Sequence, residues 1–291
     1  MKRFLNFLVS NLAIGILLLI SRLPLKLLYI IATGFYVLLY RITKYRVKIV
    51  RQNLSNSFPQ VSSEKFSVIE KQFYHYLADL IVETVKGFTI GKNQILKRIR
   101  IENPEVYEQL HKDRKSAIVA MGHCGNWEWM CRAVPLMISN TVYVAYKPLS
   151  NPYFDRLMFK ARSALGSRPI PMSQVPRLLA EQKEPFLLIL VSDQSPSDKN
   201  SSVWVKFLNQ ETAVLPGIEK LSAKYKLPVL FHEIKRIKRG YYSSRAQYIV
   251  EDGSNCVQGE ITELHTKVLE EKIMEQPSTW LWSHRRWKLK K

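Results

Sequence analysis

Apolar runs alternate with amphipathic segments from about residue 112 to the end of the chain. The continuous apolar runs predict buried strands at residues 117–121, 141–145, 186–191 and 229–234, with a further strand at 246–250. The segments between them have helical periodicity, which predicts helices at residues 126–137, 152–165, 175–181, 214–224 and 259–275. This alternation is typical of an α/β domain with a central sheet flanked by helices.

The first forty residues follow a different pattern, with two apolar runs and few charges. Phe4 to Ile20 is almost wholly apolar and, at about 1.5 Å per residue, approaches the roughly 30 Å of a hydrocarbon core. A second run, Leu27 to Tyr40, is too short for an ordinary span, so it re-enters the bilayer, lies along it or packs on the domain. No small-residue cleavage site separates the runs, which favours a retained anchor over a cleaved signal peptide. We therefore expect a membrane anchor with an interfacial helix at residues 1–45 and one domain at 46–291.

Charge adds a second indication of a membrane. Arg41, Lys44, Lys48 and Arg51 recur at helical spacing, which predicts a basic helical stripe beside the apolar runs, and such a stripe favours anionic headgroups on the cytoplasmic side. A solvated helix face is the alternative. The whole chain has 44 Lys and Arg against 24 Asp and Glu, a formal charge of +20, so its partners should be anionic. Its three cysteines form no Cys-x-x-Cys motif, which disfavours a disulfide framework or a zinc knuckle.

One predicted strand leads directly into a pair of titratable residues. Residues 117–121 are followed by Gly122 and His123, and Glu128 comes five positions later, in the expected first turn of a helix. Ligands of α/β folds bind outside the carboxyl ends of strands. A neutral imidazole can take a proton from an attacking hydroxyl, and a carboxylate on its other nitrogen fixes the tautomer. The pair predicts direct group transfer with His123 as general base and Glu128 orienting it; a structural histidine near a helix start is the alternative.

Sequence blocks along nearly the whole chain strengthen the catalytic interpretation. The block Gly122-His123-Cys124-Gly125-Asn126-Trp127-Glu128 resembles the signature of the lipid A late acyltransferases of Gram-negative bacteria, the lauroyl and myristoyl type within the lysophospholipid acyltransferase-like superfamily. Further blocks resemble this family in the same order: Tyr45 to Leu54, Phe58-Pro59, Tyr74 to Glu83, Tyr146-Lys147-Pro148, Asn151-Pro152, Asp155, Asp193-Gln194 and Trp280 to Lys288. Cys124 and Phe207-Leu208-Asn209 depart from the usual family residues.

The resemblance implies a function and a fold. It implies a mixed central sheet flanked by helices, as in glycerol-phosphate acyltransferases, and an O-acyltransferase of lipid A and lipopolysaccharide biosynthesis. The implied donor is acyl-acyl carrier protein, and the implied acceptor is an anionic lipid A precursor at the cytoplasmic side of the cell inner membrane. No cofactor, metal or nucleic acid is expected.

Other polar residues are candidates for substrate binding or for stabilising an oxyanion. Asp193 ends a second buried strand and could approach the same cleft, although a carboxylate that caps a turn is equally consistent with the sequence. The resemblance implies a basic residue that contacts the acceptor phosphate or the oxyanion, and Arg162, Arg168 and Lys147 all qualify. Asn126, inside the signature block, is the remaining candidate.

Two other functions are compatible with the sequence. The same chemistry could act on another acceptor, such as a lysophospholipid, glycolipid or aminolipid. A non-catalytic basic protein that binds membranes or nucleic acid would explain the charge, but it gives no reason for the block from Gly122 to Glu128.

Overall fold

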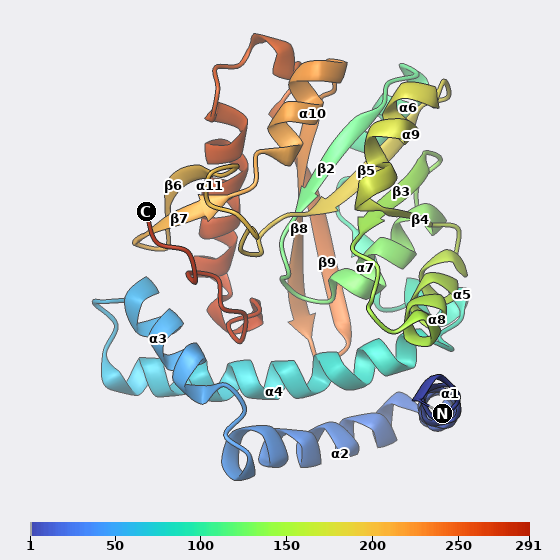
Figure 1. Ribbon diagram of the computed structural model, residues 1–291, viewed down its shortest axis with the longest axis vertical. Helices are drawn as coiled ribbons and strands as arrows, with labels where there is room; N and C mark the ends of the chain where they lie inside the picture. Colours follow the sequence, from blue (N-terminus) through green and yellow to red (C-terminus); the bar gives the residue numbers. More distant parts are fainter. Residues whose placement is uncertain (1) are drawn as a thin grey trace.

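The computed structural model describes residues 2–291 and has a mostly parallel sheet of seven strands in the order β1-β9-β8-β2-β5-β3-β4 (Figure 1). Only the pairing of β8 with β9 is antiparallel in this sheet. A separate antiparallel pair, β6 and β7, precedes α10. The α/β class with a helix-flanked mixed sheet is thereby confirmed.

The elements have the following bounds. The strands are β1 Ile99–Ile101, β2 Ala117–Met121, β3 Thr141–Tyr146, β4 Arg168–Pro171, β5 Phe186–Val191, β6 Val203–Phe207, β7 Gln210–Val214, β8 Val229–Lys238 and β9 Tyr241–Val250. The α-helices are α1 Lys2–Arg22, α2 Leu25–Tyr36, α3 Val47–Ser57, α4 Ser63–Gly87, α5 Lys92–Leu96, α6 Glu105–Lys112, α7 Trp127–Ala133, α8 Pro152–Ser163, α9 Val175–Glu181, α10 Gly217–Tyr225 and α11 Glu260–Glu275.

The central strand β2 has no polar residue because both of its faces are covered. Ile118 and Ala120 point into a core that includes α4 and α11, while Val119 and Met121 point into a second core that includes α7. A parallel strand buried on both faces reads as a continuous apolar run. The two cores therefore fix β2 rigidly, and its carboxyl end is a firm base for the loop that follows.

Two predicted helical segments differ in the structure. The predicted helix at 214–224 begins only at Gly217, because Val214 is the last residue of β7 and Pro216 precedes the helix. The predicted basic helical stripe is wrong, because α2 continues as a π-helix only to Ile42 and the chain then turns through Lys44 and Arg46, which have positive φ values of 50° and 51°. The turn separates α3 from the apolar helices.

Three long helices lie along one end of the sheet. In Figure 1, α4 runs beneath the strands, α2 lies beside it, and α1 is seen nearly end-on. Leu28 and Ala32 of α2 pack against Ala78 and Val82 of α4. By length and composition, Phe4–Arg22 and Leu25–Ile42 could each cross a membrane.

Candidate active site

The register of two neighbouring strands places His123 beside Asp193. Strands β2 and β5 are parallel, and Met121 is paired with Val191. His123 and Asp193 each lie two residues beyond that pair, so both side chains leave the same edge of the sheet at the same level. The predicted approach of Asp193 to the site is present in the structure.

Asp193 binds the imidazole of His123 directly. One carboxylate oxygen of Asp193 is hydrogen bonded to Nδ1 of His123, and the other accepts from the His123 backbone N–H at 2.8 Å and from Trp280 Nε1 at 2.7 Å. A carboxylate can only accept, so Nδ1 carries the proton and Nε2 keeps its lone pair. Gln194 Nε2 lies 3.3 Å from that second ring nitrogen. The ring is thereby held in the tautomer that a general base requires.

Gly122 allows this close approach. A Cβ atom there would lie 2.5 Å from Leu269 Cδ1 and 3.5 Å from the Asp193 carboxylate. Gly125, which ends the loop, has a φ of +55°, and a Cβ on it would lie 2.7 Å from Ile234 Cγ2. Larger residues at either position would displace the His123 loop.

Glu128 does not orient His123 in this structure, which corrects the expectation from spacing. Its carboxylate instead forms a two-pronged ion pair with Arg162 of α8, at 3.0 Å to Nε and 2.5 Å to Nη2. The physical reason is that α7 begins at Trp127 and directs Glu128 toward α8, whereas the neighbouring strand already supplies Asp193. Glu128 and Arg162 still belong to the site, because their charges both act on the His123 ring.

Burial and charge act in opposite directions on the central pair. Burial lowers the pKa of His123, but the adjacent Asp193 outweighs it with some help from Glu128, so the net pKa lies above the ordinary histidine value. Burial likewise raises the pKa of Asp193, yet His123 and the hydrogen bonds hold it far below its ordinary range. Asp193 is therefore ionised throughout the neutral range.

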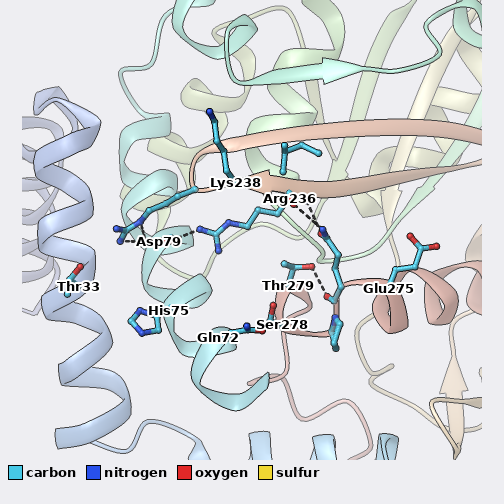
Figure 2. Close-up of a pocket in the computed structure, with 13 residues that line it drawn as sticks. Thr33, Gln72, His75, Asp79, Arg236, Lys238, Glu275, Ser278 and Thr279 are labelled. Carbon is cyan, nitrogen blue, oxygen red and sulfur yellow. Dashed lines mark hydrogen bonds and ion pairs between the residues drawn. The ribbon is translucent and has the colours of Figure 1, made fainter. Parts of the chain in front are cut away.

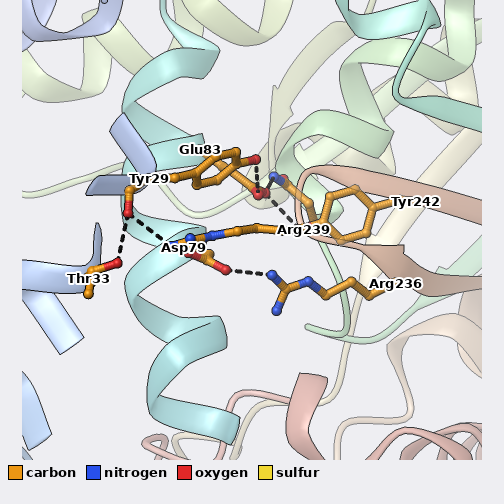
Figure 3. A network of polar contacts seen from close by, with 8 residues as sticks. Tyr29, Thr33, Asp79, Glu83, Arg236, Arg239 and Tyr242 are labelled. Atoms are coloured by element: carbon orange, nitrogen blue, oxygen red, sulfur yellow. Dashed lines mark hydrogen bonds and ion pairs between the residues drawn. The ribbon is translucent and has the colours of Figure 1, made fainter. Parts of the chain in front are cut away.

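The side chain of Asn126 has a structural role and is not accessible to a substrate. It is fully buried, and its side-chain oxygen caps α7 by accepting from the Trp129 backbone N–H at 2.9 Å. Its amide donates at 2.6 Å to Glu83 of α4, which also accepts from Tyr29 of α2 and Tyr242 of β9 (Figure 3). This network ties the His123 loop to the apolar helix α2, so Asn126 has no free group for substrate.

The two other predicted basic residues lie apart from the paired side chains. Arg168 is exposed on β4, where its guanidinium donates to the Tyr143 hydroxyl at 3.2 Å. Lys147 is exposed after β3. Arg162 is therefore the predicted cation that the structure brings to the site. Trp280 was not predicted as a partner of Asp193, although its place in the C-terminal block was a signal that could have indicated it.

A cavity of about 630 Å³ lies between α2, α4 and the turn from β8 to β9 (Figure 2). Arg236 and Arg239 line it, but both are bound to Asp79, at 2.5 Å and 2.7 Å. Thr279 forms another part of its wall, and the Thr279 carbonyl accepts from the Gly125 backbone N–H at 3.1 Å. The wall of this cavity thus connects α2 and α4 to the His123 loop.

Comparisons with known proteins identify the family of this chain. The family model for bacterial lipid A biosynthesis acyltransferases matches residues 2–289. Two relatives, a lipid A biosynthesis palmitoleoyltransferase of Escherichia coli and a lipid A biosynthesis acyltransferase of Shigella flexneri, are each 22% identical over 277 residues, which is 94% of this chain and 89% of each relative. The predicted family resemblance and enzyme class are confirmed. The chain belongs to the bacterial lipid A biosynthesis acyltransferase family.

Proposed function

We propose that this acyltransferase moves a fatty acyl chain from the thioester of acyl carrier protein to a hydroxyl of a lipid A precursor. The observation that carries the mechanism is the histidine whose Nδ1 is held by a buried carboxylate while Nε2 keeps its lone pair. The protein supplies the base, and the acceptor's own hydroxyl attacks. The mechanism therefore needs no covalent nucleophile from the protein.

The reaction follows from the orientation of His123. Nε2 takes the proton of the acceptor hydroxyl as its oxygen attacks the thioester carbonyl carbon, and Asp193 stabilises the resulting imidazolium. The tetrahedral intermediate then collapses, the C–S bond breaks, and the imidazolium returns its proton to the leaving thiolate. An ester and the free thiol of the carrier result.

Arg162 is the candidate for stabilising the oxyanion. Its Nε and Nη2 are used by Glu128, whereas Nη1 has no hydrogen-bond partner among the residues that the structure describes. The Arg162 side chain is 18% exposed, so its guanidinium is not sealed in the core. Glu128 would then act by fixing the guanidinium, and a fixed donor needs no reorganisation during the reaction.

The formal charge of +20 suits both substrates. Acyl carrier protein is acidic, and a lipid A precursor has phosphates, so a basic surface would attract the donor and the acceptor alike. The same charge would hold the protein against anionic lipid at the cytoplasmic side of the inner membrane.

The apolar helices suggest how the enzyme sits at that membrane. Figure 1 shows α1 nearly end-on and α2 side-on, so their axes cross steeply. Because α2 is packed along α4, which has buried charged residues, it cannot cross a bilayer without α4. Its outward residues Leu27, Ile30 and Ile31 are exposed and apolar. We therefore assign α1 to span the membrane and α2 to lie in the interface.

A transfer assay tests the proposal. Purified full-length enzyme in detergent is incubated with acyl carrier protein thioesters and a lipid A precursor, and the products are weighed by mass spectrometry. We expect a gain of one acyl chain, which His123→Ala abolishes. If thioester is consumed only with a lysophospholipid, glycolipid or aminolipid from an acceptor panel, that lipid and not the lipid A precursor is the acceptor. Turnover retained by folded His123→Ala would refute the mechanism.

A further inference from the structure

A second, much smaller cavity lies directly behind Asp193. Its volume is about 10 Å³, close to the space needed for one water molecule. Apolar side chains such as Phe207 and Leu269 form much of its wall, but Asp193, His265 and Arg286 also line it. His123 itself is not among the residues that line this cavity.

Arg286 is an unusual residue to find in such a place. It is only 2% exposed, and its side chain makes no hydrogen bond or ion pair with any residue that the structure describes. Its Nε and Nη1 atoms are fully buried without partners, as is Nε2 of His265. A buried guanidinium without a partner is costly, so its presence calls for a compensating charge nearby. Asp193, on the wall of the same cavity, is that charge.

The charges around His123 show what Arg286 adds. Three elements contribute them: Asp193 after β5, the ion-paired Glu128 and Arg162 of α7 and α8, and the C-terminal segment with His284 and Arg286. Glu128 and Arg162 neutralise each other, and burial lowers the pKa of His284 to about 4, so that ring is neutral at pH 7. Among these groups, only a protonated His123 or Arg286 can therefore supply the positive charge that balances Asp193.

We propose that Arg286 is a positioning residue: across the cavity, with a water molecule as the bridge, its guanidinium balances the charge of Asp193 so that His123 can remain the neutral base. Without this cation, the buried carboxylate would recruit a proton onto His123 and consume the lone pair that the reaction needs. The catalytic part of this inference rests on the proposed function. The effect of Arg286 on the pKa of His123 can be measured without turnover.

The sign of the expected effect follows from charge alone. Removing the positive charge that opposes Asp193 leaves this carboxylate to favour the protonated form of His123, so Arg286→Met raises the pKa of His123. The acidic limb of the kcat/KM profile then moves to higher pH, and on that limb each unit of displacement reduces the rate about tenfold. Arg286→Lys keeps the charge and should restore the wild-type profile.

The experiment compares three variants of the full-length chain in detergent micelles. Arg286→Met and Arg286→Lys are measured beside Arg285→Met, which removes the same charge from the exposed neighbouring residue. The His123 ring is titrated by NMR with labelled histidine and assigned by the signal missing in His123→Gln. Thermal unfolding and the pH profile of kcat/KM are recorded for each variant.

The expected result is a raised His123 pKa and a displaced acidic limb in Arg286→Met, with Arg286→Lys and Arg285→Met like the wild type. A folded Arg286→Met with an unchanged His123 titration overturns the proposal, since a packing role would lower only the unfolding temperature. If Arg286→Met does not fold, Arg286→Lys decides, because a folded lysine variant with a strongly displaced profile would also overturn it. An inactive wild type with these titration shifts would refute the proposed function alone.

Discussion

Two aspartates of this enzyme are buried to a similar degree and bonded in opposite ways. Asp79 is 3% exposed and Asp193 is 7% exposed. Asp79 is bound directly by two guanidinium groups, from Arg236 and Arg239. Asp193 accepts from a backbone N–H, an indole N–H and the ring of His123, and no arginine donates to it directly.

The difference separates a carboxylate that holds the fold from one that serves a reaction. The charge of Asp79 is balanced by two guanidinium groups that bind it directly. The cluster fastens the turn between β8 and β9 to α4 (Figure 3). Asp193 faces an imidazole, whose charge depends on a second proton, and its other bonds leave that ring free to accept this proton.

The largest effect is expected from removing the charge of Asp193. In Asp193→Asn the side-chain amide can donate to Nδ1, which places the proton on Nε2 and removes the basic lone pair. We expect acyl transfer to fall roughly a hundred- to ten-thousand-fold, as for His123→Ala. Initial rates from a thioester assay measure this. An Asp193→Asn enzyme within tenfold of the wild type would show that the bond to His123 is structural only.

Asp79→Asn should damage stability instead of chemistry. It leaves Arg236 and Arg239 without the carboxylate that balances their charges, and breaking a buried pair costs about 3–5 kcal/mol. Because Arg239 is 41% exposed, we expect a value near the lower end of that range. Urea unfolding measures it, with Glu181→Gln as a control: that carboxylate belongs to an exposed pair with Arg177, worth less than about 1 kcal/mol. A full transfer rate per folded molecule is expected for Asp79→Asn, and a hundredfold loss would contradict the division of roles.

Much of the architecture could be predicted from the sequence, because its strongest signals are local. The apolar runs at 117–121 and 186–191 coincide with β2 and β5, since strands covered on both faces tolerate no polar residue. The strand Gln210–Val214 was not predicted, because it has mixed polarity and adjoins a helical pattern.

The partners within the site could not be predicted in the same way. His123 and Asp193 were both recognised as residues that follow strands, but their contact depends on β2 lying beside β5 with Met121 opposite Val191. Neither fact is encoded within five or six residues of either side chain. Glu128 was favoured as the orienting group because it is close to His123 in sequence. The register of the sheet brings Asp193 to the ring instead.

Glu128→Gln should have an intermediate effect on transfer. It weakens the hold on Arg162 without touching Nδ1 of His123, so we expect roughly a ten- to hundredfold loss, in line with the cost of a misplaced group. Glu128 contributes to raising the pKa of His123, so its removal should also move the acidic limb of the pH profile to lower pH. Rates measured from pH 5 to 9 test both points. A loss as large as that of Asp193→Asn would restore Glu128 as the group that serves the base.

The smallest effect concerns the stability that is lost in acid because His265 is buried as a neutral ring. Burial lowers the pKa of His265, which lines the cavity behind Asp193, to about 4. The unfolded chain binds a proton there near pH 6.5, so stability from the neutral ring is lost as pH falls from about 6.5 through 4. At pH 5 the loss relative to pH 7 is about 2 kcal/mol for this residue. Urea midpoints should fall less steeply with pH in His265→Gln than in the wild type or in His111→Gln, a change at an exposed position. Equal slopes in all three proteins would mean that the His265 ring finds a proton acceptor when folded, and the cavity behind Asp193 would then be open to water rather than closed around Arg286.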